Sequence, residues 1–297
     1  MHTEAMEVVK IDRVSHHWGE GRPTESLEAL LRCSAPFDEY VYRVAEFLRA
    51  NPNLRQYPSN EFSVLDSLME HIESRIFYST EADELIYSLK GEVSGQHLIQ
   101  DAYCVWETML EKLFVDRLCS GNSSAISDYR LANRVQRLVR REVSMLNSQP
   151  KRVLFIGSGP FPISSLWLNR ILGVPTDGID ISAVAVESSK ELIGKIALNR
   201  EVQIHHQESQ SYDVSSYDMV VIALLAKPKA QILENIYASA RRDCIVICRT
   251  SFGLRSLVYE PTFVSPELLE KFMIEDMRVV KGANDDLVSS LRLSIRR

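Results

Sequence analysis

The chain has 297 residues, of which 45% are hydrophobic and 25% are charged, and its formal net charge is −6. This composition is ordinary for a folded protein of two domains or one large one. The acidic balance and the lack of a clustered basic run exclude nucleic acid as an expected partner. No apolar run has the length of a membrane span, so we expect no membrane association.

The cysteines and the N-terminus indicate the cellular compartment of the protein. Five cysteines occur, none in a C-x-x-C pair, and the polar, acidic N-terminus does not resemble a signal peptide. An odd number of thiols without a secretion signal is typical of a reducing environment. We therefore expect a cytoplasmic protein with free thiols and no metal site.

The first half of the chain has helical periodicity. Apolar residues recur at helical spacing over residues 40–48, 65–77, 98–118 and 127–146. No run of convincing strand length interrupts them. We predict an all-α helical bundle domain over residues 1–148.

After Pro150 the periodicity changes. Strand-length apolar runs at 152–156, 176–180, 202–206, 218–223 and 243–249 alternate with helical stretches at 163–172, 182–194 and 228–240. Such alternation predicts βαβ units and a parallel sheet covered on both faces. The fold class is therefore α/β, with a Rossmann-like domain over residues 149–297 after the bundle. The last residues, from about 279, are expected to add antiparallel strands at the sheet edge.

A glycine turn follows the first predicted strand. The strand at 152–156 continues directly into Gly157, Ser158 and Gly159, and Asp180 ends the next strand about twenty residues later. Glycines let the backbone approach a cofactor, and an acid at the second strand end accepts hydrogen bonds from ribose hydroxyls. The pattern predicts that a nucleotide or S-adenosylmethionine binds here. The alternative is a glycine turn in a ligand-free α/β domain.

Ligands in parallel α/β sheets bind beyond the carboxyl ends of the strands. Glu208 follows the third strand, where it would hold an adenine amino group or, alternatively, be a solvated loop acid. The predicted cofactor-binding residues are Gly157, Ser158, Gly159, Pro160, Asp180, Ile181, Glu208, Ala223 and Leu224.

Two glutamates in the helical half are candidates for chemistry. Glu107 and Glu111 are four residues apart and share a helix face among apolar neighbours. A solvated helix face is the alternative interpretation. Tyr129 follows the next loop and, taken alone, would be a packing tyrosine.

Three segments together resemble one family, the nicotianamine synthases. Residues 156–162 resemble its I-G-S-G-P-x-P signature, and residues 250–259, which end at Tyr259, resemble its S-x-x-x-L-R-x-x-x-Y segment. Residues 107–111 resemble its E-G-x-x-E helix, with Thr108 in place of the glycine. The likeness spans roughly residues 100 to 295.

The family includes plant and archaeal nicotianamine synthases and bacterial aminobutanoyltransferases that make opine metallophores, and the chain looks like the bacterial group. The resemblance implies S-adenosylmethionine as co-substrate, with no metal. One aminobutanoyl (3-amino-3-carboxypropyl) unit would pass to the amino group of histidine, and methylthioadenosine would leave. We leave open whether the protein forms a homodimer.

The resemblance also implies roles for single residues. Glu107 would contact or deprotonate the attacking amine, and Tyr129 would line the same pocket, although residues 127–133 replace the family's P-Y-Y-x-N-Y run. Glu111 would help to bind the acceptor, and Arg249 or Arg255 would hold its carboxylate through a bidentate contact. Two other functions remain open: a small-molecule S-adenosylmethionine-dependent methyltransferase, and a non-catalytic module with a vestigial nucleotide fold.

Overall fold

The structure is a computed structural model. It describes residues 26–58, 60–78, 95–121, 125–198, 200–262, 265–280 and 285–296.

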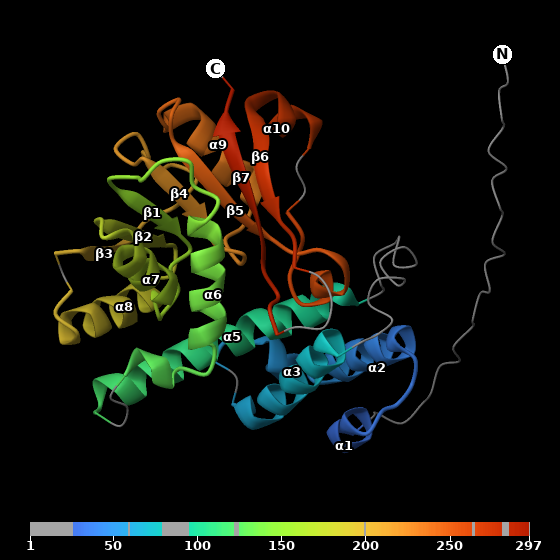
Figure 1. The fold of residues 1–297 in the computed structure, drawn as a ribbon. Coiled ribbons are helices and arrows are strands. Elements are labelled where there is room, and N and C mark those ends of the chain that lie inside the picture. Colours follow the sequence, from blue (N-terminus) through green and yellow to red (C-terminus); the bar gives the residue numbers. More distant parts are fainter. Residues whose placement is uncertain are drawn as a thin grey trace, which may run out of the picture.

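Helices make up the described part of the N-terminal half (Figure 1). The α-helices are α1 (Leu27–Leu31), α2 (Phe37–Ala50), α3 (Phe62–Phe77), α5 (Gln96–Cys119) and α6 (Ala132–Val143), with short 3-10 turns at Pro52–Arg55 and Ile126–Asp128. The predicted helical periodicity is thus confirmed over these residues. Among the helices of the described segments, none combines the length and the apolar character needed to cross a membrane.

A seven-stranded sheet forms the C-terminal half, in the order β3-β2-β1-β4-β5-β7-β6. The parallel strands are β1 (Val153–Ile156), β2 (Thr176–Asp180), β3 (Val202–His206), β4 (Met219–Ile222) and β5 (Ile245–Thr250). They are joined by α7 (Ile163–Leu172), α8 (Ala183–Lys195) and α9 (Lys229–Ser239). The α/β fold class and the alternation of elements are confirmed.

The end of the sheet differs in part from the expectation. The antiparallel strands are β6 (Phe272–Arg278) and β7 (Ser289–Ile295), so the first begins before residue 279, and helix α10 (Pro266–Lys271) precedes it. Most of β6 is exposed, with neighbouring Met273 and Ile274 each 42% exposed. An edge strand without a buried face lacks the alternation that identifies a strand in sequence.

Local sequence explains where the helices around the site begin and end. The Ser182 hydroxyl accepts a hydrogen bond from the Ala185 amide at the start of α8, which is the usual N-cap arrangement. Helix α7 ends at Gly173, whose φ of 69° is left-handed. Strands β1 and β4 are buried along their whole length, as central parallel strands require.

Helix α5 belongs to two hydrophobic cores. Its first half, including Trp106, packs in the core of the helical bundle. Its second half, including Phe114 and Leu118, packs with Phe161 and with Val186 of α8. In Figure 1 the helix accordingly runs beneath the carboxyl ends of the parallel strands. The N-terminal helices are therefore anchored directly to the rim of the sheet.

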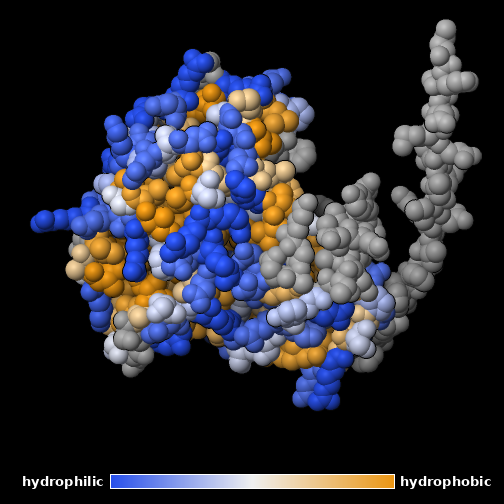
Figure 2. All heavy atoms as spheres, viewed as in Figure 1, coloured by the Kyte–Doolittle hydropathy of each residue, from blue (hydrophilic) through white to orange (hydrophobic). Residues whose placement is uncertain are grey.

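Helix α6 lies against the sheet although it precedes Pro150. Val139 packs with Val153 and Phe155 of β1, while the outer side of α6 forms a hydrophilic band on the surface (Figure 2). A division of the chain at 148/149 stays a prediction, and both α5 and α6 contact the sheet domain.

Candidate active site

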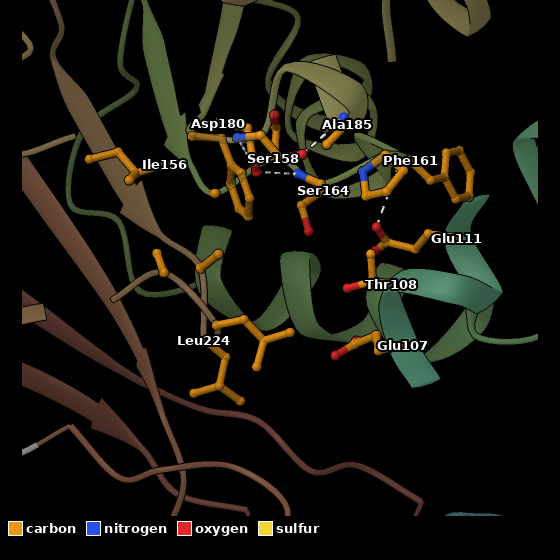
Figure 3. Close-up of a pocket in the computed structure, with 18 of the residues that line it drawn as sticks. Glu107, Thr108, Glu111, Ile156, Ser158, Phe161, Ser164, Asp180, Ala185 and Leu224 are labelled. Atoms are coloured by element: carbon orange, nitrogen blue, oxygen red, sulfur yellow. Dashed lines mark hydrogen bonds between the residues drawn. The ribbon is translucent and has the colours of Figure 1, made fainter. Parts of the chain in front are cut away.

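A cavity of about 390 Å³ lies where the carboxyl ends of β1, β2 and β4 meet α5 and α6. Sheet order reverses between β1 and β4, which is where α/β sheets form ligand crevices. Figure 3 shows Glu107 and Thr108 of α5 pointing into this space, with Leu224 on the opposite wall. The volume is in the range of small-molecule sites.

The glycine turn has the backbone that only glycine adopts easily. Gly157 has a φ of 84° and Gly159 a φ of 68°, both left-handed. A Cβ at Gly159 would lie 2.5 Å from Glu111 Oε2, and a Cβ at Gly157 would lie 3.1 Å from the Cβ atoms of Ala223 and Ala226. A side chain at either position is therefore strained by the backbone torsion angles, and at Gly159 it would also displace the Glu111 carboxylate.

Asp180 closes this turn from the end of β2. Its Oδ2 accepts a hydrogen bond from the Gly159 amide at 2.9 Å, and its Oδ1 accepts one from the Ser182 amide, also at 2.9 Å. The carboxylate is thus oriented by two backbone amides at the cavity edge. Beyond it, Ile181 and Val184 line the cavity and are 67% and 56% exposed, an apolar surface that faces solvent.

The structure brings every predicted cofactor-binding residue to this one cavity. Its lining includes Gly157, Ser158, Gly159, Pro160, Asp180, Ile181, Glu208, Ala223 and Leu224. Their shared location follows from parallel strands ending at one edge of the sheet. Their contacts with a ligand stay predictions.

Glu107 enters the cavity from α5. It lies deep in the molecule, but part of its side chain faces the cavity (Figure 3). The Tyr259 hydroxyl donates a hydrogen bond to Glu107 Oε2 at 2.8 Å. Burial raises the pKa of the Glu107 carboxyl above its ordinary value, against the opposing effects of the Tyr259 hydrogen bond and the Arg134 charge. A carboxylate with a raised pKa is suited to accept a proton.

Glu111 lies one helical turn further along α5, against the glycine turn. Its Oε2 is 3.5 Å from the Phe161 amide nitrogen, a long contact that Figure 3 marks. Burial, followed by the negative charge of Glu107, raises the pKa of Glu111 well above its ordinary value. Both carboxyls of the pair therefore have raised pKa values, and burial is the main cause in each.

Tyr129 is not among the described residues that line the cavity. It is 4% exposed, and its ring centroid lies 5.0 Å from that of Phe161 and 5.2 Å from that of Phe114. This aromatic packing agrees with the interpretation of Tyr129 as a packing tyrosine. Its expected role in the pocket stays a prediction.

The two arginines expected at the acceptor have other partners. Arg249 lines the cavity, but its Nε and Nη2 each donate to a Glu142 oxygen at 2.9 Å, and its Nη1 donates to Ser164 Oγ at 3.0 Å. Arg255 is absent from the described lining, since its buried Nε donates to the Asp286 carbonyl. The expected contact of either arginine with the acceptor carboxylate stays a prediction.

Sequence reasoning missed one charged pair at the cavity. Arg134 of α6 lines it, and its two Nη atoms donate to the two Glu73 oxygens of α3 at 2.7 and 3.0 Å. The Tyr103 hydroxyl also donates to Glu73. The arginine-rich sequence of α6 was a signal, but it did not indicate which arginine faces inward. Tyr259 ends the segment 250–259 that resembles the family, but its sequence position did not indicate that its hydroxyl reaches Glu107.

Within the described segments, no three His, Cys, Asp or Glu side chains cluster as metal ligands would. The chemistry of the cavity is that of two half-buried carboxylates, aromatic hydroxyls and guanidinium groups.

The family model described as "Nicotianamine synthase protein" matches residues 92–291. Nicotianamine synthase 9 of Hordeum vulgare is 28% identical over 152 residues, 48% of this chain and 44% of that protein. L-histidine 2-aminobutanoyltransferase of Pseudomonas aeruginosa strain UCBPP-PA14 is 30% identical over 141 residues, 46% of this chain and 52% of that protein. The chain thus spans about half the length of the curated relatives it matches.

Solved structures extend the likeness to the whole fold. MtNAS in complex with MTA and tNA aligns with a TM-score of 0.76 at 20% identity, over 89% of this chain and 100% of that one. A mutant of MtNAS in complex with S-adenosylmethionine aligns with a TM-score of 0.73 at 18% identity, with the same coverage. Because the family model matches well over half of its residues, this chain belongs to the nicotianamine synthase family.

Proposed function

We propose that this protein transfers an aminobutanoyl group from S-adenosylmethionine to the α-amino group of histidine and releases methylthioadenosine, as a step in opine-type metallophore synthesis. The observation that carries the proposal is Glu107, a half-buried carboxylate that points into the same cavity that the glycine turn lines. Family membership supports the reaction type, and relatives from Pseudomonas aeruginosa and Yersinia pestis named L-histidine 2-aminobutanoyltransferase support the acceptor.

The cavity fits S-adenosylmethionine at several points. The left-handed glycine turn leaves the backbone bare, and Asp180 is held where ribose hydroxyls would meet it. The buried Ser158 hydroxyl has no hydrogen-bond partner within the described part of the chain, so it is a donor that a ligand can satisfy. Exposed Ile181 offers an apolar surface for the adenine. The MtNAS mutant that binds S-adenosylmethionine has the same fold.

The reaction needs an amine without its proton. Glu107 accepts the proton from the acceptor ammonium group, and the Tyr259 hydrogen bond fixes the orientation of the carboxylate. The amine nitrogen then bonds to the Cγ carbon of the methionine tail. The carbon–sulfur bond breaks, its electron pair stays on sulfur, and the sulfonium becomes the neutral thioether of methylthioadenosine. Alignment of nitrogen, carbon and sulfur supplies most of the rate gain.

Glu111 and Phe161 shape the donor side. Glu111 lies against the backbone between Gly159 and Phe161. Tyr129 packs against the Phe161 ring from behind. These contacts fix the turn that would direct the methionine tail toward Glu107.

Product analysis tests the proposal. The protein is incubated with S-adenosylmethionine and L-histidine, and the products are identified by mass spectrometry. We expect histidine carrying one aminobutanoyl group and an equal amount of methylthioadenosine. Methylated product with S-adenosylhomocysteine would make the protein a methyltransferase instead, and absence of S-adenosylmethionine binding in calorimetry would favour a non-catalytic module.

Variants of the two glutamates identify the base. We expect Glu107→Gln to lower kcat about 10²- to 10⁴-fold, the usual contribution of a positioned base, while S-adenosylmethionine still binds. Glu111→Gln is the matched comparison, since it lies one turn away on the same helix. A loss confined to Glu111→Gln would assign the base to Glu111.

A further inference from the structure

In an α-amino acid, the carboxylate and the amine are bonded to the same carbon. If the amine faces Glu107, a group that binds the carboxylate must lie in the same part of the cavity. Three cationic side chains occur in the described lining: Arg134, Lys227 and Arg249.

Arg249 and Lys227 are poorly suited to this task. The Arg249 side chain is 7% exposed, and both its Nε–Nη2 edge and its Nη1 are occupied by Glu142 and Ser164. Lys227 is 47% exposed and pairs with Glu260 at 2.8 Å. An exposed ammonium on a flexible chain is a weak and undirected carboxylate ligand.

Arg134 is better placed. Its side chain is 16% exposed and lines the cavity, while its two Nη atoms bind Glu73 end-on. A guanidinium has five N–H donors in a fixed fork, and the end-on pairing uses two of them. Within the described part of the chain, the Nε–Nη2 side of the fork has a free N–H on each nitrogen for a second carboxylate, which is the bidentate geometry that such groups favour.

Arg134 also lies beside the proposed base. Its positive charge lowers the pKa of Glu107. The two are linked by packed side chains, since Tyr259 donates to Glu107 and the rings of Tyr259 and Tyr103 are 4.9 Å apart. Tyr103 in turn donates to Glu73, the partner of Arg134. Arg134 of α6 and Glu107 of α5 therefore face one region of the cavity.

We infer that Arg134, held by Glu73, forms a subsite for the α-carboxylate of the acceptor. This inference rests on the proposed function, because it requires an amino-acid acceptor at Glu107. It gives the helical bundle a direct part in selectivity, since α3 supplies the residue that orients the guanidinium. Acceptors that lack the carboxylate are disfavoured.

The test compares L-histidine with histamine, which has the same amine and ring but no carboxylate. Rates are measured for the full chain as methylthioadenosine formed. We expect Arg134→Gln to reduce the preference for histidine in kcat/KM by roughly 10- to 150-fold, the equivalent of a lost charged hydrogen bond. The main change should lie in KM for histidine, and any loss through the raised pKa of Glu107 should be shared equally by both acceptors.

Three further variants separate binding from a structural role. Glu73→Gln keeps Arg134 and removes its counter-charge, so the preference for histidine should be kept or increased. The double variant Glu73→Gln/Arg134→Gln leaves no unpaired buried charge and should lose the preference even if Arg134→Gln folds poorly. Lys227→Gln should keep it.

The outcomes that overturn the inference are distinct. Equal losses with both acceptors in Arg134→Gln and in Glu73→Gln would make the pair purely structural. Loss of the preference in Lys227→Gln alone would move the subsite to Lys227. If the unmodified protein forms methylthioadenosine with neither acceptor, the proposed function itself fails, and the subsite fails with it.

Discussion

The hydrogen bond from Tyr259 to Glu107 predicts a measurable change in pH dependence. Tyr259→Phe removes the donor 2.8 Å from Glu107 Oε2 and leaves the ring in its packed position 4.9 Å from Tyr103. The bond favours the charged form of the carboxylate and so holds its pKa down, against the burial that raises it. Its loss should therefore raise the pKa of Glu107 further.

The size of the change follows from the strength of the bond. A hydrogen bond to a charged group contributes about 1.5–3 kcal/mol, and one pKa unit corresponds to about 1.4 kcal/mol. The pKa of Glu107 should thus rise by about 1–2 units. Glu107 must be ionised to accept the amine proton, so activity is lost as the pH falls through this pKa. The acidic limb of the profile moves to higher pH in the variant.

The assay is kcat for methylthioadenosine formation at saturating histidine, measured from about pH 4 to 10, a range that includes the ordinary pKa values of a glutamate and of an α-amino group. The free acceptor amine adds its own titration to kcat/KM. This titration belongs to the acceptor, so it must be the same for both proteins and serves as an internal control. An acidic limb that does not move, or one that moves to lower pH, would refute the proposed role of the hydrogen bond.

Three other substitutions test the site and its support. Gly159→Ala should abolish S-adenosylmethionine binding in calorimetry. The control is Gly173→Ala, which should bind normally because Gly173 has an equally left-handed φ of 69° but open space around its Cβ. Weakened binding in both variants would contradict the argument. Asp180→Ala should weaken binding by about 1.5–3 kcal/mol for each lost charged hydrogen bond, and an unchanged Kd would exclude it as the ribose ligand. Glu142→Gln leaves the Arg249 charge buried without its partner and should cost about 3–5 kcal/mol in urea unfolding. A cost below about 1 kcal/mol, as for an exposed pair, would show that water reaches Arg249.

Much of the sheet domain follows from local sequence. The predicted strands at 176–180 and 202–206 and the helix at 163–172 coincide with β2, β3 and α7. The central strands β1 and β4 are buried on both faces, so their apolar runs are continuous and stand out between polar loops. Strand β6 has no such run, because its position at the sheet edge exposes most of its side chains.

The cofactor turn could be predicted because its parts are close in sequence. Gly157, Gly159 and Asp180 lie within one βαβ unit, and that unit places them together by itself. The partners of the charged groups could not be predicted in this way. Arg249 and Glu142 are 107 residues apart, and a glutamate in an arginine-rich helix is expected to be solvated until the sheet covers it.

Helix α5 explains why the bundle and the sheet must act together in the proposed reaction. A methyl group and the Cγ of the methionine tail are bonded to the same sulfur, so position alone decides which carbon the amine attacks. A misplacement of about 1 Å can cost about a hundredfold in rate. On α5, Glu107 points into the cavity where the acceptor would lie, while Glu111, one turn away, contacts the Gly159–Phe161 backbone that would hold the donor. A single rigid helix, packed into both cores, thus sets the distance between base and donor. A bundle that were only a mobile cover over the sheet would leave this distance free to vary, and the choice of carbon would be lost.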